Sequence, residues 1–305
     1  MKLSVIIPTY NAKEELSQLL LRLEEQTISF ELIIIDSSST DGTTELAYSC
    51  ADKVIIIEQK DFDHGKTRTL AAKEASGDIL LFLTQDALPV KKTTLETLIH
   101  TLEDPSIGAV YGRQLPKKES SLFGSHLRYF NYPGTSYVRY YEDRIYYGIK
   151  TAFLSDSFAA YRKEALKTIG WFKDGLIVGE DMYAGANLLQ HGYAIAYCTE
   201  AEVYHAHNYT PIQEFQRYFD IGVFHTREVW LLDTFGKTEG EGGRYVRSEL
   251  NYLLKKHAYF LIPEFLIRNS MKFIGYKLGK QYQKLPKKLV KTLSMHTSWW
   301  DKYTL

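Results

Sequence analysis

Four short apolar runs, separated by helical patterns, limit the fold of this chain more than any other feature. The runs read LSVIIP, FELIIID, KVIIIE and ILLFL, and they begin at Leu3, Phe30, Lys53 and Ile79. Each has the length of a strand, is rich in aliphatic residues and ends at a polar or turn-forming residue. Runs that are apolar throughout are typical of strands buried on both faces, as in a parallel sheet.

Helical patterns fill the spaces between these runs. Residues 12–26 carry four leucines at helical spacing, and two further helices are predicted, one from Thr43 and one over about Lys66–Ala75. The order strand, helix, strand, helix predicts parallel pairing with right-handed crossovers. The chain is therefore expected to form an α/β fold with a doubly wound sheet, and such sheets bind ligands outside the carboxyl ends of their strands.

Polar side chains gather at three of the predicted strand ends. They are Pro8, Thr9, Tyr10 and Asn11 after the first run, Asp36 after the second, and Gln85 and Asp86 after the fourth. One polar strand end is an ordinary turn, whereas three on one edge of a parallel sheet indicate a ligand site. No G-x-G-x-x-G motif or Walker lysine loop follows the first run, so neither a dinucleotide site nor a P-loop is indicated.

Four motifs, in the expected order over residues 5–193, resemble the signatures of family 2 glycosyltransferases, which have the GT-A fold. They are VIIPTYN, IIIDSSSTDGT, ASGDILLFLTQDA and GEDMYAGANLLQHGY. Within that family, FDHGKTR, LTQDALP and FQRYFDIGVF resemble the rhamnosyltransferase branch, which uses dTDP-L-rhamnose to build bacterial surface polysaccharides. The resemblance implies a Rossmann-like, mostly parallel sheet flanked by helices, with a catalytic domain at 1–230 and a helical, basic extension at 231–305.

The same resemblance implies roles for residues around a nucleotide sugar. Asp36 is expected to accept a hydrogen bond from the thymine N3–H, with Thr9 and Tyr10 beside the base. The remaining residues implied in donor binding are Pro8, Asn11, Asp63, His64, Arg68, Gln85, Asp86, Arg217 and Tyr218. Asp63 is expected near the rhamnose hydroxyls, and Arg68, His64 and Arg217 near the diphosphate or the sugar, because Arg can grip a phosphate with two parallel hydrogen bonds.

A divalent metal ion, Mg²⁺ or Mn²⁺, is the implied cofactor. Many relatives place two carboxylates after the fourth strand, but here Thr84 stands at the first position and Asp86 remains. One carboxylate can hold such an ion when diphosphate oxygens and water fill the other positions, so metal binding is expected to depend on the donor. His205 is the second implied ligand and His207 a weaker candidate. Activity without a metal stays an alternative.

The paired acids Glu180 and Asp181 precede a helix predicted over Met182–His191. Acids are common there because they favour the positive end of the helix dipole. The resemblance instead assigns Asp181 as the general base that removes a proton from the acceptor hydroxyl while the donor carbon is inverted. From a β-L donor, the product would be an α-L-rhamnoside.

Charge is distributed unevenly along the chain. From Arg244 to Leu305 there are 13 Lys and Arg against 3 Asp and Glu, which leaves 24 against 34 in residues 1–243. The basic tail, which ends near Trp299 and Trp300, predicts a peripheral contact with an anionic membrane surface, a helical pair packed on the catalytic domain with its lysines in solvent, or both at once. No nucleic-acid motif accompanies the charge, so nucleic acid is not expected as a partner.

Other features bear on location and partners. The isolated Cys50 and Cys198 suit a reducing cytoplasm, and the first apolar run is a strand rather than a signal peptide. No apolar run approaches the about 20 residues that cross a bilayer. The resemblance implies a lipid-diphosphate-linked saccharide acceptor at the cytoplasmic face of the membrane. Residues 116–150, dense in Tyr and Arg, are expected to form an acceptor groove or an interface, such as that of a homo-oligomer.

Two other functions stay open at this point. One is a family 2 enzyme that uses another donor, such as a UDP-hexose or a UDP-N-acetylhexosamine. The other is a non-catalytic scaffold that binds a nucleotide sugar. The chain retains both Asp86 and Asp181, neither of which a scaffold requires, and this favours an enzyme.

Overall fold

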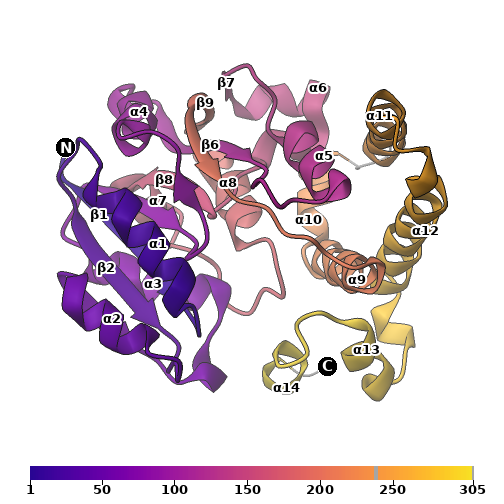
Figure 1. Cartoon of the computed structure of the whole chain (residues 1–305), viewed down its shortest axis with the longest axis horizontal. Helices are drawn as coiled ribbons and strands as arrows, with labels where there is room; N and C mark the ends of the chain where they lie inside the picture. The colour runs from indigo at the N-terminus through magenta and orange to yellow at the C-terminus, as the bar shows by residue number, and fades with distance from the viewer. Residues whose placement is uncertain (237–239, 304–305) are drawn as a thin grey trace.

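The computed structural model describes residues 1–236 and 240–303, which form a sheet flanked by helices with a further group of helices on one side (Figure 1). Within these residues the sheet has nine strands, in the order β3-β2-β1-β4-β8-β6-β9-β5, with β7 paired to β9. The strands are β1 (Leu3–Thr9), β2 (Glu31–Asp36), β3 (Lys53–Ile56), β4 (Ile79–Leu83), β5 (Leu88–Pro89), β6 (Ile107–Leu115), β7 (Tyr137–Arg139), β8 (Phe158–Arg162) and β9 (Ala194–Tyr204). The α-helices are α1 (Lys13–Glu24), α2 (Thr43–Cys50), α3 (His64–Glu74), α4 (Thr94–His100), α5 (Leu122–Asn131), α6 (Arg144–Tyr147), α7 (Lys163–Thr168), α8 (Glu180–Gln190), α9 (Pro211–Arg227), α10 (Val229–Phe235), α11 (Glu241–Lys255), α12 (Ile262–Gly279), α13 (Lys287–Leu293) and α14 (Trp299–Lys302).

The first half of the sheet is parallel, as the alternation of strands and helices predicts. Strand β1 lies between β2 and β4, and Ile6 stands opposite Ile33 on one side and Phe82 on the other. All three side chains are fully buried, which explains why these strands are apolar on both faces. The predicted strands and the helices α1, α2, α3 and α8 are confirmed within a few residues of their expected limits.

Beyond β4 the sheet becomes mixed. Strand β8 runs antiparallel to both β4 and β6, and β9 then pairs parallel to β6. Because β8 runs against β4, the residues that precede β8 lie beside those that follow β4: Leu83 stands opposite Phe158, and the Thr84 N–H donates to the Ser157 carbonyl at 3.3 Å. This antiparallel pair brings two segments far apart in the sequence to one edge of the sheet.

Helices α9 and α12 approach closely at glycines. A Cβ atom added at Gly275 or Gly279 of α12 would lie 2.4 Å from the Phe215 carbonyl oxygen or 2.0 Å from the Phe219 carbonyl oxygen of α9. A Cβ at Gly222 of α9 would lie 2.5 Å from the Tyr276 carbonyl oxygen. Only glycine allows backbones to pack at this distance. The pair joins the C-terminal helices to the rest of the chain (Figure 1).

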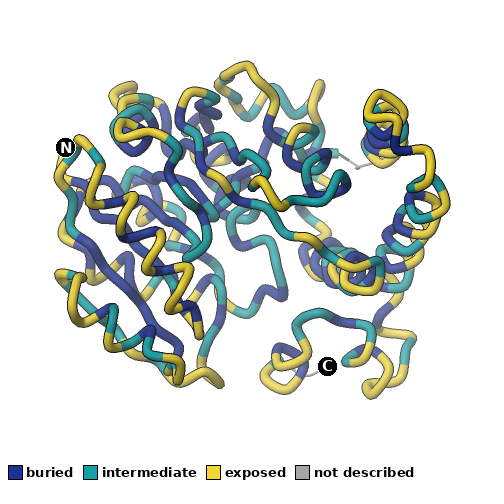
Figure 2. Tube along the Cα trace, in the orientation of Figure 1, coloured by how far each residue is buried: buried dark blue, intermediate teal, exposed yellow. Residues whose placement is uncertain are grey.

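The C-terminal residues are part of the main core. Val290, Trp299 and Trp300 are buried in the same cluster as Ile6 of the sheet. Figure 2 shows α14 at the lower edge of the molecule, with both buried and exposed stretches. Trp299 and Trp300 are only 6% and 5% exposed, so these two side chains are not part of any membrane-facing edge of the tail. The alternative, tail helices packed on the catalytic part, describes the structure. The proposed domain boundary at residue 230 stays a prediction.

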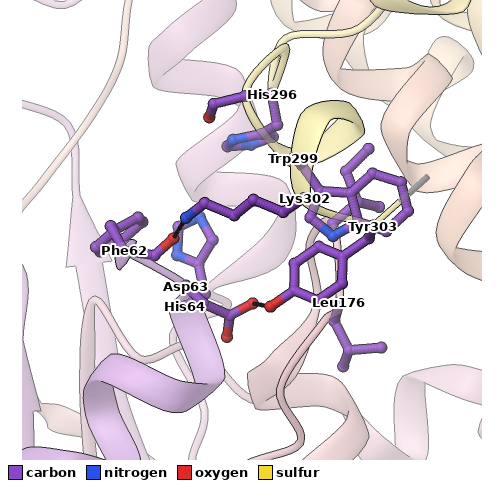
Figure 3. A pocket seen from close by; sticks show the side chains of 10 residues that line it. Phe62, Asp63, His64, Leu176, His296, Trp299, Lys302 and Tyr303 are labelled. Atoms are coloured by element: carbon purple, nitrogen blue, oxygen red, sulfur yellow. Dashed lines mark hydrogen bonds between the residues drawn. The ribbon is translucent and has the colours of Figure 1, made fainter. Parts of the chain in front are cut away.

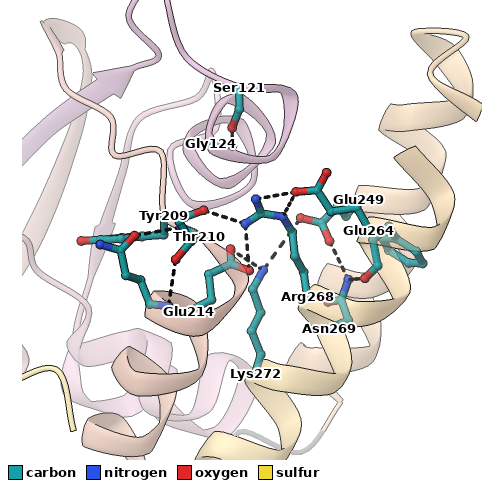
Figure 4. Close-up of polar contacts among 12 residues, drawn as sticks. Ser121, Gly124, Tyr209, Thr210, Glu214, Glu249, Glu264, Arg268, Asn269 and Lys272 are labelled. Atoms are coloured by element: carbon teal, nitrogen blue, oxygen red, sulfur yellow. Dashed lines mark hydrogen bonds and ion pairs between the residues drawn. The ribbon is translucent and has the colours of Figure 1, made fainter. Parts of the chain in front are cut away.

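Part of the basic surplus of the tail is neutralised inside the protein (Figure 4). Arg268 and Lys272 of α12 are buried and lie 3.2 and 3.3 Å from the two carboxylate oxygens of Glu214 on α9. Glu249 of α11, which is fully buried, lies 3.9 Å from the Lys272 ammonium and accepts a 2.7 Å hydrogen bond from Asn269. These ion pairs connect α9, α11 and α12. In the described part of the chain, no helix is long and apolar enough to cross a membrane.

The contact between α9 and α12 gives a test of the packing. Gly275→Ala is expected to lower the free energy of unfolding by about 1–3 kcal/mol, because the added methyl group overlaps a backbone oxygen. Gly243→Ala on α11, where an added Cβ meets nothing within 4 Å, should instead raise it by up to about 1 kcal/mol through helix propensity. Chemical denaturation of both variants measures the difference. Equal stabilities would contradict the close packing.

Candidate active site

Three side chains that could hold a metal ion meet where β4 and β9 end. Asp86 follows β4, and His205 and His207 follow β9. One ligand atom from each lies within 4.8 Å of the others. His205 Nε2 is 3.4 Å from one oxygen of Asp86, and His207 Nδ1 is 4.0 Å from the other. Imidazole nitrogens and a carboxylate are suitable ligands for Mn²⁺ and comparable divalent ions.

Gln114 on β6 fixes which nitrogen of His205 faces this group. Its Oε1 accepts a hydrogen bond from Arg128 Nη1, which can only donate, so this atom must be the amide oxygen. The same oxygen lies 2.8 Å from His205 Nδ1, which therefore carries the proton. Nε2 is then left with its lone pair toward Asp86, and among the described residues it is buried without a hydrogen-bond partner. A metal ion would satisfy that nitrogen, so the group fits the predicted metal site.

The protonation states at this site also suit a metal ion. Burial alone would raise the pKa of the Asp86 carboxyl, but His205 and His207, when they are protonated at acidic pH, hold it well below its usual range. Burial is the main cause that lowers the pKa of His205, and it lowers the pKa of His207 to about 4. Near neutral pH the carboxylate is thus ionised and both imidazoles are neutral, the forms that bind metals.

A cluster of three acids lies at the same edge of the sheet. Glu180 and Asp181 begin α8, and Asp156 precedes β8. The Arg68 guanidinium of α3 lies 3.0 Å from Glu180 Oε1 and 3.3 Å from Asp156 Oδ2, and all three of these side chains are buried. Asp181 is half-buried, and its oxygens accept hydrogen bonds from the N–H groups of Met182 (2.7 Å) and Asp156 (3.4 Å).

The cluster holds its carboxylates at different pKa values. Burial, with the negative charges of Glu180 and Asp156, raises the pKa of Asp181 well above its usual range. Burial also raises the pKa of Asp156. For Glu180, by contrast, the pairing with Arg68 and His64 outweighs burial and lowers the pKa. Asp181 is therefore the more basic member of the adjacent pair, which suits an acceptor of protons.

Neither carboxylate oxygen of Asp36 is free to accept a hydrogen bond from a nucleotide base. It is fully buried, and its oxygens accept hydrogen bonds from the Thr9 hydroxyl, from the N–H and hydroxyl of Ser39 and from the Thr44 hydroxyl. These donors occupy the lone pairs of both carboxylate oxygens. The expected contact between Asp36 and thymine N3–H is corrected accordingly: Asp36 fixes the loop between β2 and α2. Thr9 is buried in that network.

Four other predicted donor residues lie in β1 or just after β1 and β4. The Tyr10 N–H donates to Gln85 Oε1 at 3.0 Å, which joins the ends of β1 and β4. The Asn11 N–H donates to the Ser39 hydroxyl at 2.8 Å. The Tyr10 side chain is 41% exposed, so its ring is available to a ligand. Pro8, half-buried within β1, stands opposite Ile35 of β2.

Asp63 has a structural role that the sequence prediction missed (Figure 3). Its Oδ1 accepts from the Lys66 N–H at 2.8 Å and so caps α3, while Oδ2 accepts from the Gly175 N–H and the Tyr303 hydroxyl, both at 3.0 Å. Since the side chain is 5% exposed, its expected contact with sugar hydroxyls is corrected to one within the protein. A glycine is also needed at position 65, because an added Cβ would lie 1.9 Å from the Lys173 carbonyl oxygen.

The structure also changes the role expected of Arg68 and shows where His64 and Arg217 lie. The Arg68 guanidinium is occupied by carboxylates, so the expectation that it contacts a diphosphate is not supported. His64 Nδ1 lies 3.8 Å from Glu180 Oε1. Arg217 is exposed on α9. The Arg217 guanidinium lies 5.8 Å from the centre of the Tyr209 ring, which packs against His207 with 5.3 Å between ring centroids, so Arg217 lies close to the metal group. Tyr218, next to Arg217, is half-buried.

Two site residues, Gln114 and Asp156, were absent from the sequence prediction. Asp156 precedes β8, whose antiparallel place beside β4 has no local signal. Gln114 follows Arg113 in the mostly buried strand IGAVYGRQL and is itself only 1% exposed. A buried amide side chain needs hydrogen-bond partners, so a glutamine in a buried strand could have indicated a polar site.

Comparison with known proteins identifies the family. The profile described as Glycosyl transferase family 2 matches residues 4–170. The O-antigen chain rhamnosyltransferase RfbN of Salmonella typhimurium is 46% identical over 99% of this chain and 96% of the relative. WbaN of Salmonella anatum, also named an O-antigen chain rhamnosyltransferase, is 44% identical over 98% of this chain and 95% of the relative. The chain belongs to glycosyltransferase family 2.

Solved structures show which known proteins share this fold. The mannosyltransferase PcManGT of Pyrobaculum calidifontis, solved in complex with GDP-Man and Mn²⁺, has a TM-score of 0.61 at 18% identity and covers 93% of this chain and 88% of that one. TarS 1–349 of S. aureus in complex with UDP-GlcNAc has a TM-score of 0.56 at 18% identity, covering 93% and 92%. At this identity the likeness concerns the fold, and the predicted GT-A fold is confirmed.

The orientation of His205 gives a prediction for this glycosyltransferase. Gln114→Leu is expected to weaken Mn²⁺ binding about 10- to 100-fold, because the hydrogen bond that fixes the histidine tautomer is lost, and His205→Ala should weaken it further. Electron paramagnetic resonance of Mn²⁺ in the presence of a nucleoside diphosphate measures the affinity. His100→Ala, which alters an exposed histidine paired with Glu103, is the control. Wild-type affinity in both site variants would exclude this metal site.

Proposed function

We propose that the protein is an inverting glycosyltransferase that moves L-rhamnose from dTDP-β-L-rhamnose to a hydroxyl of a lipid-diphosphate-linked saccharide, for a bacterial surface polysaccharide. One observation carries the enzymatic part: a metal-ligating group, Asp86 with His205 and His207, and a carboxylate of raised pKa, Asp181, lie at one edge of the sheet. The choice of sugar is supported by the names of the two relatives that match almost the whole chain.

Different side chains would act on the donor and on the acceptor, and those at the donor are the metal group, Arg217 and Tyr10. Asp86, His205 and His207 would hold Mg²⁺ or Mn²⁺. Such an ion supplies positive charge that neutralises the leaving diphosphate. Arg217, exposed on α9 near this group, adds a guanidinium that can bind a phosphate with two parallel hydrogen bonds. Tyr10 offers an exposed ring on which the nucleotide base can stack.

Asp181 would act at the acceptor. Its carboxylate takes the proton of the acceptor hydroxyl as the hydroxyl oxygen forms a bond to C1 of the donor sugar. The bond from C1 to the diphosphate oxygen breaks at the same time, and its electron pair leaves with the nucleoside diphosphate. Attack from the face opposite the leaving group inverts C1. The raised pKa of Asp181 makes it a stronger base than an ordinary carboxylate.

Asp181→Asn tests this assignment. The variant should lose at least about 1,000-fold in transfer rate, at the upper part of the range typical of a lost general base, while nucleotide-sugar affinity in calorimetry stays within about 2-fold of wild type. Asp233→Asn, on the exposed side of α10, is the matched control. Transfer by Asp181→Asn at the wild-type rate would remove Asp181 as the base.

A panel of donors tests the sugar and the nucleotide. Wild-type protein is incubated with dTDP-rhamnose, UDP-glucose or UDP-N-acetylglucosamine, and nucleoside diphosphate release is measured with a lipid-linked acceptor fraction. Release from dTDP-rhamnose is expected. Release from a UDP-sugar alone would replace the proposed donor, and binding without release from any donor would favour the scaffold function.

We also propose that the protein reaches its acceptor at an anionic membrane surface through the outer face of α12. Leu266, Ile267, Phe273 and Ile274 on this helix are exposed, and Phe260, just before it in the 3₁₀ turn Tyr259–Leu261, is 80% exposed. An apolar stripe of this size on a soluble helix indicates a contact surface.

The charges beside the stripe favour a membrane over a second copy of the chain. Exposed lysines lie at both ends: Lys255 and Lys256 precede it, and Lys277 and Lys280 end it. Glu264, the only acid in the fully described helix α12, is paired with Arg268. Two copies packed face to face would bring like charges together, whereas anionic lipid would complement them.

Co-sedimentation with vesicles tests this surface. Wild-type protein should bind vesicles of phosphatidylglycerol and phosphatidylcholine better than phosphatidylcholine alone. The double variant Phe260→Ser/Phe273→Ser should bind at least about 10-fold more weakly, because two aromatic side chains no longer enter the interface. Tyr146→Ser on α6, where the tyrosine is 77% exposed, is the control. Equal binding by the double variant would exclude the α12 face.

A further inference from the structure

An acid in the motif FQRYFDIGVF holds a turn near the end of the chain. Asp220 of α9 is fully buried. Its Oδ1 accepts from the Ser294 hydroxyl at 2.6 Å, and its Oδ2 accepts from the N–H groups of Met295 at 2.9 Å and His296 at 3.2 Å. A carboxylate that binds successive backbone N–H groups fixes the path of the chain. Asp220 therefore determines where residues 294–296 lie, 74 positions further along the sequence at Ser294.

After this turn, the chain runs back over the loops that precede α3 and α8 (Figure 3). The contacts are from Trp299 Nε1 to the Gly175 carbonyl (3.2 Å), from Lys302 Nζ to the Phe62 carbonyl (2.6 Å) and from the Tyr303 hydroxyl to Asp63 Oδ2 (3.0 Å). The buried Trp299 and Trp300 add apolar contact to these hydrogen bonds. The C-terminal segment is thus attached to the loops that precede α3, which carries Arg68, and α8, which begins with Glu180.

His296 is the residue that this segment brings to the acid cluster. Its ring packs edge-to-face against His64 with 5.4 Å between centroids, and His64 Nδ1 lies 3.8 Å from Glu180, the neighbour of Asp181. Both rings line a cavity of about 30 Å³ together with Phe62, Leu176 and Trp299. Within the described residues, the ring nitrogens of His296 make no hydrogen bond, so they remain available to a ligand.

The state of His296 suits a neutral polar ligand. Burial, with the nearby His64 and Arg217, lowers the pKa of His296 to about 4. The imidazole is therefore uncharged near neutral pH and offers one N–H donor and one nitrogen acceptor. A sugar hydroxyl needs both a donor and an acceptor, and a cavity of about 30 Å³ has room for such a hydroxyl rather than for a whole sugar ring.

We propose that the C-terminal segment Ser294–Tyr303 forms a wall of the active site, and that His296 is a specificity-determining residue that hydrogen-bonds a hydroxyl of the transferred sugar. This proposal rests on the proposed glycosyl transfer and adds a part of the site that lies outside the family profile, which ends at residue 170. It also gives the motif around Asp220 a role: the acid positions His296 from 76 residues away.

Donor kinetics of three variants test the proposal. His296→Ala should raise the KM for the donor on the order of 10-fold, the factor that one hydrogen bond supplies, with little change in melting temperature or in Mn²⁺ affinity. His296→Gln, which keeps a donor and an acceptor, should recover part of the loss. Thr297→Ala, at an exposed neighbouring position, should match wild type.

Asp220→Ala gives a second, independent readout. It should raise the donor KM as much as His296→Ala does, and limited proteolysis should then cut the C-terminal segment. An unchanged donor KM in His296→Ala would overturn the proposal, as would a loss in His296→Gln equal to that in His296→Ala. The kinetics use whichever donor the wild type accepts in the panel, so failure with dTDP-rhamnose would refute the donor assignment without affecting this test.

Discussion

The ion pairs of Arg68 are the interactions on which the catalytic end of the sheet depends. Three carboxylates from two distant segments meet there, and burial of that much negative charge is unfavourable unless it is paired. Arg68 contacts Glu180 and Asp156. Among the described residues no cation contacts Asp181, and this difference leaves the pKa of Asp181 high while the pKa of its neighbour Glu180 is lowered. Loss of one partner from a buried ion pair of this kind lowers the free energy of unfolding by about 3–5 kcal/mol. Arg68 therefore stabilises the fold, and it also gives the adjacent acids Glu180 and Asp181 different pKa values.

The sheet topology explains how the two halves of the site come together. Parallel strands deliver Asp86 from β4, and β9 delivers His205 and His207, because β9 lies beside β6 and carries its carboxyl end to the same edge. The antiparallel strand β8 inserts between them and brings Asp156. Helix α9 then connects the site to the tail: Arg217 is exposed near the metal group, whereas Asp220, buried three residues later, holds the C-terminal turn. One helix therefore serves both the site and its C-terminal wall.

The sequence predicted what local patterns determine and missed what distant contacts determine. Strands β1 to β4 are continuous apolar runs, so their existence and parallel order could be inferred, as could the acids that begin α8. Asp86 and His205 were named from family motifs, and the structure brings them together. Asp36 and Asp63 were expected to bind ligand. Both carboxylates instead accept hydrogen bonds from donors within the protein, and a sequence cannot locate those donors. For Trp299 and Trp300 the sequence left open a membrane edge, of which aromatic residues near lysines are typical, and packing on the catalytic part. They are buried because Asp220 turns the chain back toward the core.

The central claim is that a metal ion binds between Asp86 and His205, at the edge of the sheet where Asp181 also lies. A crystal structure with Mn²⁺ and dTDP tests it most directly, because anomalous scattering locates the manganese independently of the protein phases. The account predicts a single strong anomalous peak at metal–ligand distance from His205 Nε2 and an Asp86 oxygen, with the diphosphate bound to it. A nucleotide held elsewhere, or a manganese peak that contacts neither residue, would contradict it.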